Sequence, residues 1–257
     1  GALAVLVAGC SSTAIPSHQG SVASTLGAVT TQASTSPTRE PAKRFNPFVD
    51  HTESAGGRVV IENPSMGDVM RPGPLPERSL GRADAPVTVI KYASLTCPYC
   101  RKFHLETFPL LKKRYIDTGQ MRFILREFPI GFQSGAATIA LRCVPAKHYF
   151  SAYGALLEAQ SRWVSQEVRR DPIWQVVRKF GLTRTQFDAC YDDKELVADL
   201  NAVKERGRTL GVIGTPNFYI SNKLYKRVLT MTDFDAVMSG APIAGASTSS
   251  LPAGARR

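Results

Sequence analysis

Two cysteines lie close together at the point where an expected strand gives way to an expected helix. They are Cys97 and Cys100, with only a proline and a tyrosine between them. The run Val87–Tyr92 before them is almost entirely apolar, as in a buried strand, and Arg101–Tyr115 after them has apolar residues at helical spacing. Unpaired N–H groups at the start of a helix favour a thiolate at Cys97, and Cys100 follows one turn later. The spacing therefore predicts a reactive pair of thiols that can close a disulfide.

The other cysteines argue against a zinc site. The chain has five cysteines, and the remaining three, Cys10, Cys143 and Cys190, are far apart in the sequence. A zinc ribbon needs a second close pair of ligands. Of the four histidines, only His104 lies near the paired cysteines. We therefore expect neither a metal ion nor a cofactor.

The chain has a formal net charge of +11, which raises the question of a nucleic-acid partner. Its basic residues form short clusters at 112–114, 169–170 and 226–227, without interleaved aromatic residues. No nucleic-acid-binding motif accompanies them. A solvated basic surface accounts for the charge, so we expect no nucleic acid to bind.

The first residues indicate export. Residues 1–9 are apolar and resemble the end of a signal peptide. The sequence Val-Ala-Gly-Cys at 7–10 resembles a bacterial lipobox, so we expect Cys10 to be lipidated and to anchor the protein to a membrane. An ordinary signal peptide with an incidental cysteine is the alternative. Either reading predicts an oxidising exported compartment, the periplasm.

The composition divides the rest of the chain into three parts. Residues 11–57 are rich in Ser, Thr, Ala, Gly and Pro and predict a disordered linker. Residues 58–239 are expected to fold, and residues 240–257 to form a flexible tail. Within the folded part, a second buried strand is expected at Met121–Phe128, and a helical period at about 134–207. The elements expected after it are two strands, Asn217–Ile220 and Lys223–Lys226, and a short helix, Thr232–Met238.

Local signals suggest where helices begin, bend and end. Pro109 lies inside the helix that follows the paired cysteines and should bend it. Asp171 followed by Pro172 predicts a helix with Asp171 as its N-cap. Thr183 and Gln186 have the spacing of a capping box.

Four segments together resemble the DsbA-like branch of the thioredoxin superfamily. They are Ala-Pro-Val-Thr-Val-Ile at 85–90, Ser-Leu-Thr-Cys-Pro-Tyr-Cys at 94–100, Arg-Glu-Phe-Pro at 126–129 and Gly-Thr-Pro at 214–216. The resemblance covers about residues 75–238. It implies an α/β protein with a thioredoxin fold and an inserted helical domain, which the stretch at about 134–207 would form.

The resemblance also implies roles for individual residues. Cys97 would be the exposed nucleophile, Cys100 the buried resolving cysteine and Pro216 a cis-proline facing them. The residues expected to contact substrate are Thr215, Pro98 and Tyr99. The implied partners are cysteine-containing exported proteins and a redox partner that recycles the cysteine pair. We expect the protein to act as a monomer.

The direction of electron flow depends on positions that point in opposite ways. Tyr99 stands where the strongest oxidases of this family have histidine, which indicates a less strongly oxidising disulfide. Lys91 stands where relatives often hold a buried acid; it would either stabilise the Cys97 thiolate or reach the surface without effect. His104 is a further candidate for tuning the thiolate. We expect an oxidase. The alternatives are an isomerase or reductase of the same fold, and a copper chaperone that uses Cys97, Cys100 and His104.

Cys143 and Cys190 lie on expected helices at either end of the helical stretch. In an oxidising compartment we expect a structural disulfide between them. Two buried free thiols, packed as small apolar side chains, are the alternative.

Overall fold

The computed structural model describes Gly1 and residues 60–243. The predicted lipidation site Cys10, the predicted linker at 11–57 and most of the predicted tail at 240–257 lie outside the described residues, and they stay predictions.

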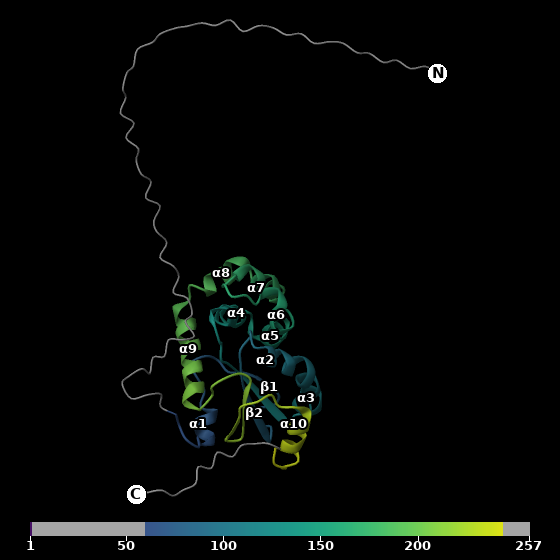
Figure 1. Ribbon diagram of the computed structural model, residues 1–257, viewed down its shortest axis with the longest axis vertical. Coiled ribbons are helices and arrows are strands. Elements are labelled where there is room, and N and C mark those ends of the chain that lie inside the picture. The colour runs from purple at the N-terminus through teal and green to yellow at the C-terminus, as the bar shows by residue number, and fades with distance from the viewer. Residues whose placement is uncertain (2–59, 244–257) are drawn as a thin grey trace, which may run out of the picture. The chain divides into compact units, whose positions relative to one another are not determined.

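A mixed five-stranded sheet forms the centre of the domain (Figure 1). Its strands are β1 (Arg78–Leu80), β2 (Val87–Ala93), β3 (Met121–Glu127), β4 (Asn217–Ile220) and β5 (Lys223–Tyr225), in the spatial order β1-β3-β2-β4-β5. Strands β2 and β3 are parallel and the other pairs are antiparallel. Four strands lie within a residue of their predicted positions, and β2 is central, as its apolar sequence indicated. The short strand β1 was not expected from the sequence.

The helices fall into two groups. Those outside the helical stretch are α1 (Met66–Met70), α2 (Pro98–Lys102), α3 (Phe108–Leu111) and α10 (Met231–Met238), with π-helical turns η1 (Phe103–Thr107) and η2 (Lys112–Ile116) continuing α2 and α3. Those between β3 and β4 are α4 (Phe132–Cys143), α5 (Tyr149–Glu158), α6 (Gln160–Trp163), α7 (Arg170–Val177), α8 (Arg184–Cys190) and α9 (Lys194–Thr209), with 3-10 turns η3 (Ala146–His148) and η4 (Arg178–Phe180). None of the helices in the described part of the chain is long and apolar enough to span a bilayer.

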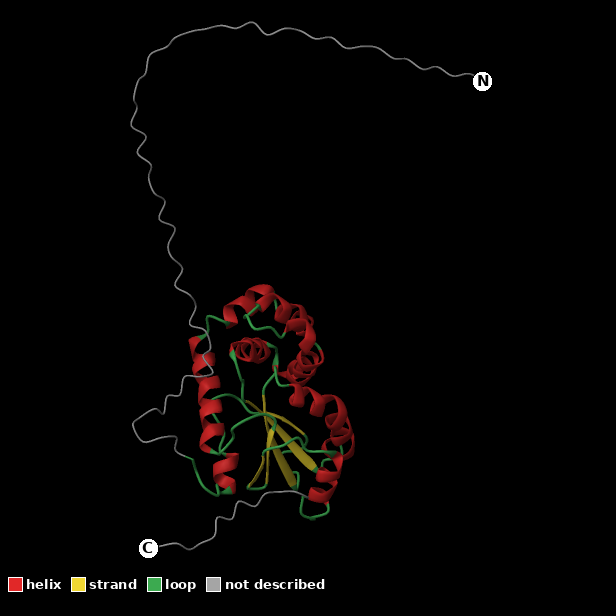
Figure 2. Ribbon diagram, viewed as in Figure 1, coloured by secondary structure: helices red, strands yellow, loops and turns green. Residues whose placement is uncertain are grey.

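The two faces of β2 contribute to two different hydrophobic clusters. Val89 and Ala93 belong to the larger cluster, which also includes the helices that follow β2 and the helices between β3 and β4. Ile90 and Tyr92 point the other way, into a smaller cluster with Val69 of α1 and residues that follow α9. This alternation follows from the two-residue period of a strand. Figure 2 shows α9 along one side of the sheet and α3 with α10 along the other.

The predicted helix start at Asp171 is wrong by two residues. Helix α7 begins at Arg170, and Arg169 is its N-cap. The Asp171 carboxylate accepts a hydrogen bond from Arg184 Nη1 at 2.6 Å instead of capping the helix. Pro172 is tolerated as the third helical residue, two positions further in than predicted, because the first four N–H groups of a helix have no intrahelical acceptor. The capping box of Thr183 and Gln186 is confirmed at the start of α8.

The helix that follows the paired cysteines changes its hydrogen-bond pattern next to Pro109. The N–H of Phe108 donates to the carbonyl of Phe103, five residues earlier, which closes the π-helical turn η1. Pro109 then lies in the first turn of α3. Proline has no N–H to donate, so the regular α-helical bond is missing at residue 109, and the π turn lies directly before it.

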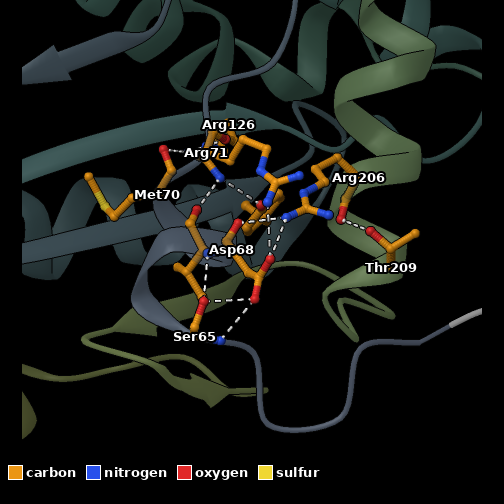
Figure 3. A network of polar contacts seen from close by, with 9 residues as sticks. Ser65, Asp68, Met70, Arg71, Arg126, Arg206 and Thr209 are labelled. Atoms are coloured by element: carbon orange, nitrogen blue, oxygen red, sulfur yellow. Dashed lines mark hydrogen bonds and ion pairs between the residues drawn. The ribbon is translucent and has the colours of Figure 1, made fainter.

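A polar network fixes the short helix α1 to the rest of the domain (Figure 3). The Asp68 carboxylate accepts from the backbone N–H of Ser65 at 3.2 Å, which completes a capping box. Arg206 of α9 donates to the Asp68 carbonyl at 2.8 Å, and Arg126 of β3 donates to the Val69 carbonyl at 2.8 Å. A helix of five residues is not stable alone, so these arginines hold it in place.

A disulfide joins Cys143, at the end of α4, to Cys190, at the end of α8. The Sγ–Sγ distance is 1.97 Å and the Cα–Cα distance is 6.4 Å. The bond closes a loop with a sequence separation of 47 and ties together helices that also pack on each other.

Candidate active site

Cys97 lies where the sequence predicted it, at the start of a helix. It is the N-cap residue of α2, and Pro98 occupies the first helical turn. The Cys97 N–H donates to the Ser94 carbonyl at 3.2 Å, which closes a tight turn after β2. The Ser94 hydroxyl lies 2.8 Å from the hydroxyl of Ser134 at the start of the helical region. The turn is therefore fixed from two sides before the helix begins.

The Cys97 thiol is partly exposed and strongly acidified. It donates to the Thr215 carbonyl at 3.1 Å. A hydrogen bond from the Cys100 thiol is the largest cause that lowers the Cys97 pKa to about 5; burial opposes this, and the Thr215 side chain and the N–H groups of Cys100 and Tyr99 add to it. The N–H groups at the helix start thus lower the Cys97 pKa, as the sequence predicted, but the neighbouring Cys100 thiol lowers it more.

Cys100 has the opposite environment. Its side chain is 0% exposed. Burial is the largest cause that raises the Cys100 pKa well above its ordinary value. At neutral pH one sulfur is therefore a thiolate and the other a thiol, which is the asymmetry that thiol–disulfide exchange needs.

A cis peptide bond precedes Pro216, and the residue before it, Thr215, contacts Cys97. The bond joins Thr215 to Pro216, immediately before β4, which pairs with β2. The Thr215 carbonyl contacts Cys97, as described above, and the buried Thr215 hydroxyl has no hydrogen-bond partner among residues 60–243. It is available to donate to a thiolate. Pro216 itself is buried, whereas Pro98 and Tyr99 are exposed beside Cys97.

Lys91 does not reach the surface, so that alternative is wrong. Its side chain is 1% exposed, and its Nζ lies 3.4 Å from the Tyr153 hydroxyl and 4.3 Å from the centre of the Phe103 ring. Burial lowers the Lys91 pKa to about 8, while the thiols of Cys100 and, more weakly, Cys97 raise it. Lys91 is not among the main causes of the low Cys97 pKa. Its stronger coupling is to Cys100.

His104 is half-buried and neutral. Its ring stacks on Phe108 with centres 5.3 Å apart and meets the Tyr153 ring edge-on at 5.6 Å. Burial, followed by the charge of Lys91, lowers the His104 pKa to about 4. At neutral pH it therefore offers no positive charge to a thiolate. No group of three potential metal ligands occurs within the described ranges, so the geometry does not favour the copper alternative.

Gln160 supports the site and was not found from the sequence. Its side-chain nitrogen donates to the carbonyls of Leu95 at 2.7 Å and Cys97 at 3.1 Å. Gln160 is 9% exposed and opens α6. A single glutamine in a helical stretch gives no sequence signal for a contact 63 residues away.

Exposed apolar side chains surround Cys97 along the chain segments that form the site. Tyr99 is 61% exposed, Ile213 before the cis peptide is 71% exposed, and Ile130 is 44% exposed. The Ile130 carbonyl accepts a hydrogen bond from Thr96 at 3.3 Å, so this residue lies next to the turn that carries Cys97. Such a rim suits an extended polypeptide with apolar side chains.

Curated proteins with similar sequences are named for disulfide chemistry. A relative from Rickettsia bellii, provisionally named a protein-disulfide oxidoreductase, is 30% identical over 147 residues, which cover 55% of this chain and 56% of the relative. Disulfide bond formation protein D of Bacillus subtilis is 23% identical over 166 residues, which cover 62% of this chain and 72% of that protein. The chain therefore spans little more than half the length of the Rickettsia relative.

Solved structures of DsbA proteins have the same fold. The crystal structure of Wolbachia pipientis α-DsbA1 matches with a TM-score of 0.62 and 26% identity, over 68% of this chain and 95% of that one. Oxidised BdbD from Bacillus subtilis matches with a TM-score of 0.60 and 18% identity, over 72% of this chain and 98% of that one, a likeness of fold. A family model described as thioredoxin matches residues 75–239, more than half of the chain. The chain therefore belongs to the thioredoxin family, and its domain has a thioredoxin-like fold similar to that of DsbA structures.

Proposed function

We propose that this protein is a dithiol–disulfide oxidoreductase that oxidises cysteine pairs in exported polypeptides through Cys97 and Cys100. One observation carries the proposal. A partly exposed thiol with a pKa lowered to about 5 lies beside a fully buried thiol with a raised pKa. The names of the similar proteins support the same chemistry.

The reaction follows from this asymmetry. A substrate thiolate attacks Sγ of Cys97 in the oxidised pair, the Cys97–Cys100 bond breaks, and its electron pair goes to Cys100, which then takes up a proton. A second substrate thiolate attacks the substrate sulfur of the mixed disulfide and releases the Cys97 thiolate. The substrate loses two electrons and leaves with a disulfide, and the cysteine pair gains those electrons.

The environment of Cys97 favours oxidation over reduction of the substrate. A stabilised thiolate lowers the free energy of the reduced protein, and this makes its disulfide a stronger oxidant. The Cys100 thiol, the Thr215 side chain and two N–H groups all act in this direction. A redox partner is then needed to return the cysteine pair to the disulfide form.

The place of action is part of the proposal. Disulfides persist in oxidising compartments, and the bond between Cys143 and Cys190 suits one. The lipobox-like sequence ending at Cys10 supports a membrane-anchored protein in the periplasm.

Equilibration of the protein with glutathione buffers tests the direction of flow. We expect a reduction potential nearer to that of the strong oxidant DsbA, about −120 mV, than to that of thioredoxin, about −270 mV. Oxidation of a reduced dithiol peptide should be rapid, and the Cys97→Ser variant should not catalyse it. A potential close to that of thioredoxin would instead assign the protein as a reductase.

A further inference from the structure

Lys91 occupies a position where a charge is costly. It lies in the central strand β2, paired in register with Leu125 of β3 and Phe218 of β4. Its side chain is 1% exposed, and the neighbours on both sides are apolar. Burial disfavours an ammonium group unless a partner compensates the lost hydration.

The nearest groups compensate that cost only in part. Across residues 60–243, no carboxylate oxygen lies within ion-pair distance of Lys91 Nζ. Its contacts are the Tyr153 hydroxyl at 3.4 Å, the Phe103 ring at 4.3 Å and, further off, the Tyr153 ring at 5.7 Å. A neutral hydroxyl and an aromatic face each contribute on the order of 1 kcal/mol. The contacts seen here leave the ammonium without a resident anion.

Four titratable side chains face Lys91 from the elements packed against β2. They are Cys97 and Cys100 from α2, His104 from η1 and Tyr153 from α5. Burial keeps His104 and Tyr153 neutral, since it lowers the pKa of the imidazole and raises the pKa of the phenol. Of these four described side chains, only the two thiols can supply a negative charge to the ammonium.

Of the two thiols, Cys100 is coupled more strongly to Lys91. Phe103, whose ring lies against Nζ, is one helical turn after Cys100, and both side chains are buried in the same cluster. Among the groups that lower the Cys100 pKa against its burial, Lys91 is the largest. Conversely, Cys100 raises the Lys91 pKa more than Cys97 does.

We propose that Lys91 is a positioning residue for Cys100: its ammonium, buried on β2 against Phe103 one helical turn from Cys100, stabilises the Cys100 thiolate while that sulfur leaves or attacks Cys97. This role rests on the proposed function and specifies how the buried cysteine of the pair works. When the disulfide opens, the electron pair of the broken bond resides on Cys100 next to Lys91 until solvent supplies a proton. When it closes, Cys100 gives its proton to solvent, its thiolate attacks Cys97, and the substrate sulfur leaves as a thiolate. Lys91 keeps its proton throughout.

The closing step can be followed in the full-length protein with Ellman's reagent, an aromatic disulfide. A Cys10→Ser background keeps the predicted lipidation cysteine from reacting. Attack by Cys97 releases the first coloured thiolate, and attack by Cys100 on the resulting mixed disulfide releases the second. The first phase reports on Cys97 alone, and the second reports on Cys100.

The proposal predicts that Lys91→Met slows only the second phase. At pH 7 we expect a decrease of about tenfold, with the pH midpoint of this phase raised by about one unit, since one pKa unit corresponds to a tenfold change in thiolate. The first phase should stay within about twofold. Lys91→Arg, which keeps the charge, should restore the second phase. Lys102→Met is the matched control, because Lys102 lies on α2 but its side chain is 61% exposed.

The outcomes separate this role from the proposed function. A wild type that never forms the Cys97–Cys100 disulfide would overturn both. A second phase in Lys91→Met that matches the wild type in rate and pH midpoint would overturn the role of Lys91 alone. So would equal slowing of both phases, or a Lys91→Arg protein as slow as Lys91→Met, because these indicate a packing defect. If Lys91→Met fails to fold, Lys91→Gln is measured in its place and judged by the same results.

Discussion

The cost of burying Lys91 can be measured as stability. In the folded protein the Lys91 pKa falls from 10.5 to about 8, with burial as the largest cause. The difference of about 2.5 units corresponds to about 3 kcal/mol of unfavourable free energy for the folded state at neutral pH. Lys91→Met removes this cost. It also removes the hydrogen bond from Lys91 to the Tyr153 hydroxyl, which costs the variant about 1 kcal/mol of stability. The variant should therefore be more stable than the wild type by about 2 kcal/mol at pH 7.

The sign of the pH dependence follows from the lowered pKa. Below about pH 8 the lysine is protonated in both states, and the whole penalty applies. Between about 8 and 10.5 the folded state loses the proton first, so the stability of the wild type rises with pH. The advantage of Lys91→Met should shrink across this window.

Urea denaturation at pH 7 and pH 10 measures the difference. A background with Cys97→Ala and Cys100→Ala removes the thiols that would titrate in this range and preserves the disulfide elsewhere in the domain. Without these thiols the Lys91 pKa is lower still. In this background the cost of burying the ammonium is therefore at least as large as the value worked out above. A Lys91→Met protein that is less stable than its parent at pH 7, or a gap that does not change with pH, would refute the reasoning.

Three further predictions follow from the site and its supports. Alkylation of Cys97 by iodoacetamide should show a midpoint at about pH 5, and Cys100→Ala should raise that midpoint because the Cys100 thiol is the largest cause of the low pKa; an unchanged midpoint would contradict this. Gln160→Leu removes the side-chain donor shared by the Leu95 and Cys97 carbonyls, of which the Cys97 carbonyl keeps its bond from the Arg101 N–H, so we expect about 2 kcal/mol less stability in urea and slower reaction at Cys97, and wild-type values for both would show that the contact is dispensable. Replacing Cys143 and Cys190 by alanine should cost about 4 kcal/mol in the chain-entropy model, given their separation of 47, and chemical denaturation would show no loss if the bond does not form in solution.

The sequence was sufficient wherever one local rule decides the structure. The apolar run before Cys97 predicted the central strand, and the Thr183 capping box predicted the start of α8. The position of Cys97 at a helix start followed from the strand and helix on either side of it. In each case the deciding pattern lies within a few consecutive residues, and the tertiary contacts, such as the pairing of β2 with β3 and β4, agree with the local preference.

Predictions failed or were missing where a residue distant in the sequence determines the local structure. Asp171 has the sequence of an N-cap, but Arg184, thirteen residues away, takes its carboxylate. Gln160 supports the turn at Cys97 from a different helix, and nothing in its own segment marks it. The short strand β1 exists because β3 pairs with it, since three residues carry too little pattern to be recognised alone.

The charge on Lys91 also connects the fold to the direction of the reaction. While the cysteine pair is oxidised, neither sulfur carries a charge, and the buried ammonium has no anion nearby among the residues described. Reduction creates a thiolate at Cys97 and, during exchange, a thiolate at Cys100, and both raise the Lys91 pKa by attraction. The attraction is therefore present only in the reduced protein, which it stabilises relative to the disulfide. A charge that is unfavourable for the stability of the oxidised fold thus makes the disulfide more oxidising, in the same direction as the hydrogen bonds at Cys97.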